Sequence, residues 1–204
     1  MIVVVEGPTA AGKTTWCRRH VGRFVGEAAH TGAEPIDGVA LARHWARVSM
    51  RRWAEAQELE RTDGVAFCDT DPIKLHYAWG MAALGLAPRA PFDRELAVLR
   101  AAMRTGRLGF ADAVLVGLPE VAELRSRRDE DTTRRRRNFA THVQLREPLR
   151  QWYEALDGLD PGRVFWELPD TGVPKLPEPR AQRSSVDLLD ALIAALPPLR
   201  VRPA

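Results

Sequence analysis

The stretch Gly7-Pro8-Thr9-Ala10-Ala11-Gly12-Lys13-Thr14-Thr15 decides the fold of this chain, and it follows directly on the apolar run Ile2-Val3-Val4-Val5 and Glu6. It fits the pattern G-x-x-x-x-G-K-[ST], in which a strand leads into a glycine loop and then a helix. No proline interrupts residues 14–25, so a helix can follow the loop. The sequence therefore predicts a phosphate-binding loop over residues 7–15.

Each part of this loop has a physical task in holding a nucleoside triphosphate. Gly7 and Gly12 let the backbone turn so that successive N–H groups point into one concavity. Lys13 can reach the β- and γ-phosphate oxygens, and the Thr14 hydroxyl can ligate Mg²⁺. The alternative is a tight glycine turn with an incidental lysine. Only Lys13, Lys74 and Lys175 are lysines among 30 basic residues, and a position that stays lysine against that bias indicates a needed point charge.

Composition limits the class of protein. A chain of 204 residues can bury one core, so we expect a single domain over residues 1–204. The net charge of +3 is spread along the chain, which does not favour nucleic acid as a partner. Two cysteines without metal-ligand spacing indicate reduced thiols, and no apolar run approaches the ~20 residues that a bilayer needs. We expect a cytoplasmic protein without a membrane partner.

Short apolar runs alternate with helical patterns along the chain. Strands are expected at residues 2–5, 65–68, 113–116 and 164–166, with a weak edge strand near residues 33–36. Helical patterns are expected at residues 39–61, after Pro72, and near residues 92–105, 120–137, 139–156 and 186–196. This order predicts an α/β three-layer sandwich, in which helices cover both faces of a parallel five-stranded sheet.

Two carboxylates, Asp69 and Asp71, follow the apolar run at residues 65–68. The carboxyl edge of an open parallel sheet is where ligands bind, so both carboxylates are candidates for the site. Asp69 is suitably placed to support Mg²⁺, although an aspartate before Pro72 can also serve only to form a turn.

The order of these parts resembles the P-loop nucleoside and nucleotide kinases, above all deoxynucleoside and thymidylate kinases. The residues that carry the resemblance are Glu6-Gly7, Glu34-Pro35, Trp45, Asp69, Leu118-Pro119-Glu120-Val121 and the arginines from Arg125 onward. One departure is Thr70, because deoxynucleoside kinases usually have an arginine after the acidic residue. The Asp69-Thr70-Asp71 run is similar to the kinase part of nicotinamide riboside kinases.

The resemblance implies a kinase that uses ATP and Mg²⁺, with a small arginine-bearing lid at about residues 120–138. Lys13, Glu34, Asp69 and Arg128 would be catalytic, with Thr14 and Asp69 at the metal. Glu34, Trp45, Asp71 and Arg125 would contact the acceptor. Glu34 is the first choice as the base that takes the proton of the acceptor hydroxyl, and Asp71 is the second. A solvated loop carboxylate at Glu34 and a solvated arginine face on the lid are the competing interpretations.

Three functions remain open on this reading. The first is phosphoryl transfer from ATP to a nucleoside or nucleotide, and the second is transfer to another small molecule, such as an antibiotic or nicotinamide riboside. The third is a nucleotide-binding switch or ATPase, which would have no acceptor pocket. ATP and a small acceptor are the expected partners, and a homodimer is compatible with this reading.

Overall fold

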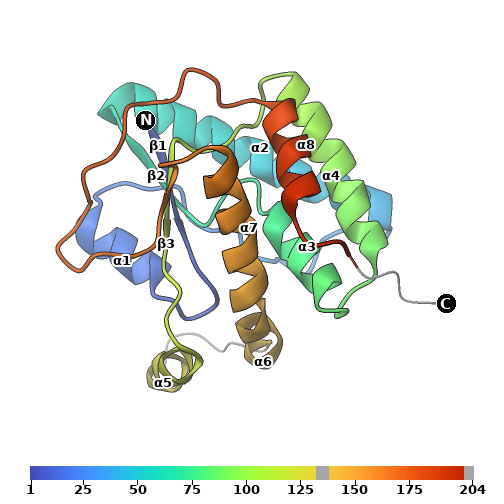
Figure 1. The fold of residues 1–204 in the computed structure, drawn as a ribbon, viewed down its shortest axis with the longest axis horizontal. Coiled ribbons are helices and arrows are strands. Elements are labelled where there is room, and N and C mark those ends of the chain that lie inside the picture. The colour runs from blue at the N-terminus through green and yellow to red at the C-terminus, as the bar shows by residue number, and fades with distance from the viewer. Residues whose placement is uncertain (132–137, 200–204) are drawn as a thin grey trace.

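The computed structural model describes residues 1–131 and 138–199, and it confirms the α/β class with a parallel sheet (Figure 1). The sheet has four strands in the order β2-β1-β3-β4, and all neighbours run parallel. The strands are β1 (Ile2–Glu6), β2 (Ala66–Asp69), β3 (Ala113–Val116) and β4 (Val164–Phe165). Because β1 is central and buried along its whole length, the loop that follows it starts from the middle of the sheet.

The helices divide between the two faces of the sheet. In Figure 1, α1 lies on one face and the layer that contains α2, α7 and α8 lies on the other. The helices are α1 (Lys13–His20), α2 (Gly38–Asp63), α3 (Leu75–Ala83), α4 (Arg89–Arg104), α5 (Val121–Glu130), α6 (Phe139–His142), α7 (Arg146–Leu159) and α8 (Val186–Ala195). A short 3₁₀ turn, Val143–Leu145, joins α6 to α7.

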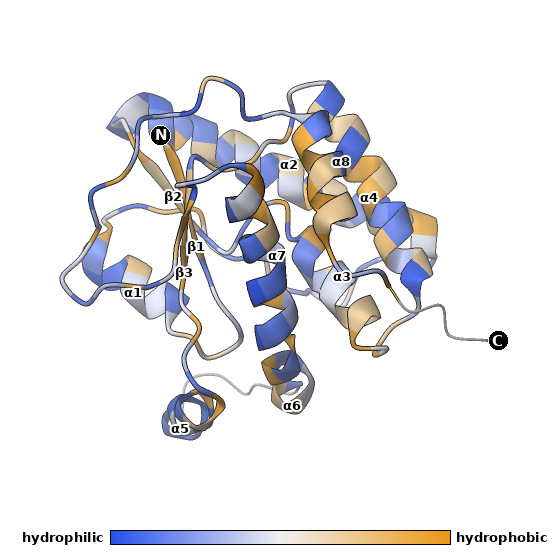
Figure 2. Ribbon diagram, in the orientation of Figure 1, coloured by the Kyte–Doolittle hydropathy of each residue, from blue (hydrophilic) through white to orange (hydrophobic). Residues whose placement is uncertain are grey.

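The alternating directions of the β1 side chains explain why a hydrophobic core lies on each face of the sheet. Ile2 and Val4 pack into the large core beneath α2, α4, α7 and α8, whereas Val3 and Val5 pack beside Trp16 of α1. Successive side chains of a strand point to opposite faces, so one apolar strand serves both layers. Figure 2 shows the strands in hydrophobic colours, while the covering helices carry mixed hydrophobic and hydrophilic bands.

The predicted edge strand at residues 33–36 is wrong. These residues form no strand, and the edge position beside β2 is taken by Val25, which makes an isolated parallel bridge with Cys68. The Val25 N–H donates to the Phe67 carbonyl at 2.8 Å, and the Val25 carbonyl accepts from the Asp69 N–H at 2.9 Å. The sheet therefore has four strands and not five, and Gly26 and Glu27 follow its true edge.

The residues at the ends of α1 and α2 explain where these two helices begin and end. The Asp37 carboxylate caps α2 by accepting from the N–H groups of Val39 and Ala40, and α2 ends at Gly64 with a left-handed φ of 79°. The first helix stops at His20, because Val21 is extended, so it is shorter than residues 14–25 allowed. Among the described helices, none combines the length and apolarity that crossing a membrane requires.

Candidate nucleotide and acceptor site

The loop that the sequence predicts to bind phosphate, called the phosphate loop below, lies at the carboxyl end of β1, where the parallel strands end together. A Cβ on Gly7 would lie 2.5 Å from the Gly117 carbonyl oxygen, so only glycine fits the close approach to the end of β3. Gly12, with a φ of 90°, turns the chain into α1. The first turn of α1 therefore opens directly toward the loop, which is the arrangement that binds anions.

Lys13 lies over this loop. Its ammonium donates to the carbonyl oxygens of Gly7 at 2.8 Å and of Pro8 at 3.3 Å. Both acceptors belong to the loop, so the ammonium is held against the loop and outside the hydrophobic core.

Thr14 and Asp69 meet across the ends of β1 and β2. The Thr14 hydroxyl donates to Oδ2 of Asp69, and Oδ1 of Asp69 is buried without a hydrogen-bond partner among the described residues. Burial raises the pKa of Asp69, while the Thr14 hydrogen bond and the nearby Lys13 charge oppose this rise. A hydroxyl beside a carboxylate with an unused oxygen is the hard oxygen donor set that Mg²⁺ prefers.

Asp71 is buried in a hydrogen-bonded network below the site. Its Oδ1 accepts from the Ile73 N–H at 2.9 Å, and its Oδ2 accepts from the Tyr153 hydroxyl at 3.1 Å. Burial raises the pKa of Asp71 to about 6. Burial also lowers the pKa of the neighbouring His76 to about 4, so this imidazole is neutral at pH 7. Both oxygens of Asp71 are already used inside the protein.

Glu27 lies beside the sheet edge formed by Val25, whereas the edge strand predicted from the sequence is at residues 33–36, which include Glu34. Its carboxylate pairs with the Lys74 ammonium at 2.9 Å, and its charge acts on the pKa of Asp69 and of His142. Lys74 has a left-handed φ of 46° at the start of α3. Tyr77 of α3 and His142 of α6 meet beside them at 3.1 Å. The structure thus groups Glu27, Lys74, Tyr77 and His142, and of these Glu27 is close enough for its charge to act on Asp69.

Glu34 lies on the segment that leads into α2, and Trp45 lies within α2 itself. The Glu34 carboxylate accepts from the Thr31 N–H at 2.6 Å and from the Gly32 N–H at 3.0 Å, and these bonds lower its pKa. Trp45 is partly exposed and packs edge-to-face with His30 at 4.6 Å between ring centroids. The Glu34 carboxylate therefore closes the turn at residues 31–34, next to the His30 ring that contacts Trp45.

The arginines of α5 point in different directions. Arg127 donates to the Ala11 carbonyl of the phosphate loop at 2.7 Å. Arg128 lies 4.6 Å from the Phe139 ring centroid and pairs with Asp129, while Arg125 is exposed. The expected arginines at residues 134–137 lie outside the described residues. Of the described α5 arginines, Arg127 is the one that contacts the phosphate loop, and it was not among the residues chosen from the sequence.

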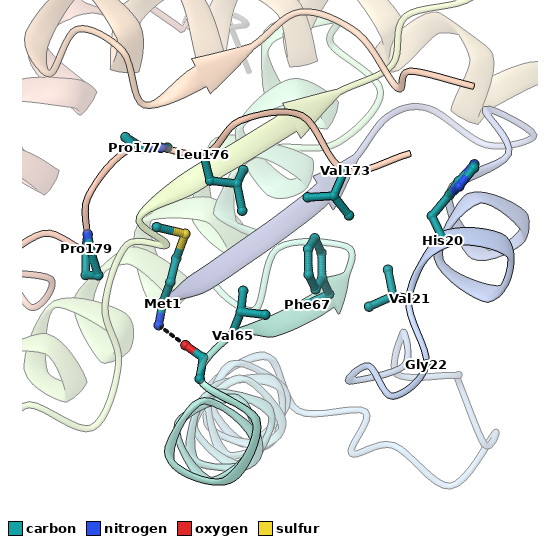
Figure 3. Close-up of a pocket in the computed structure, with 11 residues that line it drawn as sticks. Met1, His20, Val21, Gly22, Val65, Phe67, Val173, Leu176, Pro177 and Pro179 are labelled. Carbon is teal, nitrogen blue, oxygen red and sulfur yellow. Dashed lines mark hydrogen bonds between the residues drawn. The ribbon is translucent and has the colours of Figure 1, made fainter. Parts of the chain in front are cut away.

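An open apolar depression lies at the other end of the sheet, away from these residues (Figure 3). It has a cavity volume of about 630 Å³, and Val21, Val65 and Phe67 face Val173, Leu176 and Pro177 of the long loop before α8. Its lining residues do not include Lys13, Thr14 or Asp69, so it is separate from the candidate site.

No protein-family model matches the chain, and comparison with curated protein sequences gave no match either. Solved structures do match. Deoxyadenosine kinase from M. mycoides, with the products dCMP and a flexible dCDP, has a TM-score of 0.56 at 12% identity, over 95% of this chain and 96% of that chain. The same kinase with dATP bound has a TM-score of 0.53 at 10% identity, over 82% and 91%. The chain therefore has the fold of these P-loop nucleoside kinases.

Proposed function

We propose that this protein is an ATP- and Mg²⁺-dependent kinase that transfers the γ-phosphate of ATP to a nucleoside or nucleotide. The observation that carries the proposal is the joining of Lys13, Thr14 and the unused oxygen of Asp69 at the end of β1 and β2. Phosphoryl transfer requires positioning and charge neutralisation more than covalent chemistry, and these three groups supply both.

The roles of the phosphate loop follow from its donors. The backbone N–H groups of residues 7–15 and the Lys13 ammonium would bind the phosphates, while Thr14 and Asp69 would hold Mg²⁺. Bound Mg²⁺ neutralises charge on the phosphate oxygens and orients them for in-line transfer. Arg127 is close enough to the loop to add charge there, and Arg125 and Arg128 remain the proposed lid arginines from the sequence.

For the base, we propose Glu27 ahead of Glu34 and Asp71. A base must be an accessible carboxylate within reach of the acceptor hydroxyl. The Glu27 carboxylate is partly exposed and held by Lys74, whereas Glu34 is bound by its own turn and Asp71 is enclosed. Trp45, beside His30, is proposed to stack on the planar part of the acceptor.

The first acceptors to test are deoxynucleosides, since the similar structures hold deoxynucleotides. Purified protein with MgATP would be screened by coupled ADP release against nucleosides, nucleotides and other small hydroxyl compounds, with Lys13→Ala as the blank. Acceptor-dependent ADP release and a phosphorylated product support the proposal. Acceptor-independent ADP release would instead indicate an ATPase, and phosphorylation of a compound that is neither nucleoside nor nucleotide would correct the substrate class.

A further inference from the structure

Glu6 is a buried carboxylate that joins two loops of the candidate site. It is 2% exposed; its Oε1 accepts from the Gly7 N–H at 2.8 Å, and its Oε2 accepts from the Asp71 N–H at 2.9 Å. Gly7 begins the phosphate loop, and Asp71 closes the acidic turn after β2. A single side chain therefore fixes the distance between the phosphate loop and the turn that carries Asp69.

Arg52 makes the matching connection from the opposite side. This α2 guanidinium is 5% exposed and donates to the carbonyl oxygens of Asp69 and Thr70, both at 2.7 Å, and of Gly26 at 3.0 Å. Within the described part of the chain, no ion pair joins Arg52 to a carboxylate. Its charge is compensated by backbone dipoles of the acidic turn and of the sheet edge that leads into Glu27.

Burying two charged side chains costs desolvation free energy unless hydrogen bonds of good geometry compensate for it. A carboxylate is the side chain with two strong acceptors, and a guanidinium is the one with five donors in a fixed fork. Glutamine in place of Glu6 would present an NH₂ group to one N–H donor, and lysine in place of Arg52 could not reach carbonyls on two separate segments. The two acceptor oxygens of Glu6 and the several donors of Arg52 thus suit the backbone N–H and carbonyl groups that these side chains join.

We propose that Glu6 and Arg52 are positioning residues that hold the phosphate loop, the acidic turn and the Gly26–Glu27 edge in fixed register for phosphoryl transfer. The inference deepens the proposed function and rests on it for its kinetic part. Neither residue touches the transferred group; both act through Gly7, Asp69 and Glu27. Misplacement of reacting groups by about 1 Å can cost on the order of 100-fold in rate, so loss of either connection is expected to lower kcat by about that factor.

The chain offers matched controls at the amino ends of the strands. Asp112 is a buried carboxylate whose two oxygens accept from the N–H groups of Ile2 and Arg180 and also from the Arg183 guanidinium. Arg163 is a buried guanidinium that donates to the Ala111 carbonyl and pairs with Asp160. Asp112→Asn and Arg163→Lys therefore make the same kinds of side-chain change as Glu6→Gln and Arg52→Lys at the far end of the sheet, where each residue also has an ion-pair partner.

All four variants are expected to lower Tm, but only Glu6→Gln and Arg52→Lys should lower kcat at a temperature where every variant is folded. Their Kd for MgATP should change far less than kcat, because Lys13 and the loop amides remain. If Glu6→Gln does not fold, Glu6→Asp takes its place, since the shorter carboxylate keeps the charge but can reach only one of the two N–H groups. Equal kcat in these variants and their controls would overturn the inference.

Amide hydrogen exchange separates this inference from the proposed function. In Glu6→Gln, the amides of Gly7 and Asp71 should exchange faster relative to the rest of the sheet, and in Asp112→Asn they should not. If the wild type phosphorylates no acceptor, the kinase proposal fails, and this measurement still decides whether Glu6 joins the two loops. Unchanged exchange at both amides would show that it does not.

Discussion

The Thr14 hydroxyl donates a hydrogen bond of 2.5 Å to Oδ2 of Asp69, which connects the start of α1 to the end of β2. Because Oδ1 of Asp69 has no described partner, the charge of this carboxylate is available to a cation. Asp69→Asn keeps the shape and removes the charge. We expect the Mg²⁺ concentration at half-maximal turnover to rise by about 10-fold or more, while metal-free nucleotide binding changes little. Superimposable Mg²⁺ titrations for the two proteins would make Asp69 a structural residue.

Lys13→Ala removes an ammonium whose described contacts are loop carbonyls. Turnover is expected to fall by at least about 100-fold, because a preorganised donor to the transferring phosphate is lost. Affinity for ATP should fall as well, and Tm should stay close to that of the wild type. Lys175→Ala is the control, since it removes a lysine of the long loop before α8. Unchanged ATP affinity in Lys13→Ala would remove the basis of the proposed function.

The three candidate bases can be ranked by near-isosteric changes. Glu27→Gln is expected to lower kcat by about 100-fold, which is the lower end of the usual contribution of a general base. Glu34→Gln should lower kcat by only a few-fold, since its carboxylate is held by Thr31 and Gly32. Asp71→Asn should act mainly on the KM of the acceptor. A larger effect in Glu34→Gln would return the base to the position that the Glu-Pro resemblance indicates.

The ion pair between Glu27 and Lys74 complicates that comparison, because removing a carboxylate also frees a lysine. Lys74→Met is the companion variant. If Glu27 acts as a base, Lys74→Met should retain more activity than Glu27→Gln. The pH–rate profile of Lys74→Met should shift along the pH axis and keep its shape. Loss of activity to the same degree in both variants would mean that the pair supports the fold of the edge and not the proton transfer.

The lid arginines differ in their distance from the phosphate loop. Arg127→Ala is expected to lower kcat by about 100-fold, because Arg127 already contacts the loop at Ala11 and can add charge where the phosphates bind. Arg128→Ala should affect Tm more than kcat, since Arg128 packs over Phe139. Arg125→Ala is the exposed control on the same helix. The reverse order of kcat values among these three variants would restore the choice made from the sequence.

An ion network far from the site predicts how stability depends on pH. Hydrogen bonds from Arg183 lower the pKa of Glu60 from 4.5 to about 2. A depressed folded-state pKa means that the stabilisation is present above pH 4.5 and is lost as the pH falls toward 2. Urea unfolding from pH 7 to pH 3 should therefore show the stability difference between wild type and Glu60→Gln shrinking with acid. Glu58→Gln, which breaks an exposed pair with Arg61, should show little difference at any pH.

The parts of the fold that local pattern decides were predictable. The glycine loop, the apolar runs of β1 to β4 and the long helix α2 follow from neighbours in the sequence, and the structure confirms them. The sheet edge was not predictable, because Val25 joins it through a single bridge to Cys68, a residue far along the chain. The place of Glu27 beside this edge was not predictable for the same reason, whereas the Glu-Pro resemblance indicated Glu34.

The contact between Arg127 and the Ala11 carbonyl was not predictable for a different reason. The arginines of α5 are the same residue type, so the sequence does not distinguish them. The rotation of α5 about its axis decides which arginine faces the phosphate loop, and the packing of Leu124 and Phe139 beside Ala11 sets that rotation. Glu6 was recognised as part of a motif but not as a buried connector. Its partners are backbone N–H groups, which carry no side-chain signal in a sequence.

The closing helix has a consequence for the order of folding. Leu189 and Leu192 of α8 are fully buried in the same core as Ile2 and Val4 of the first strand. Because α8 packs against α7 and α4, the core that these helices share with β1 stays incomplete until α8 has been synthesised. Long-range contacts of this kind slow folding and leave apolar surface exposed in the meantime. A nascent chain halted before residue 186 should therefore need a chaperone, although it already contains the whole phosphate loop.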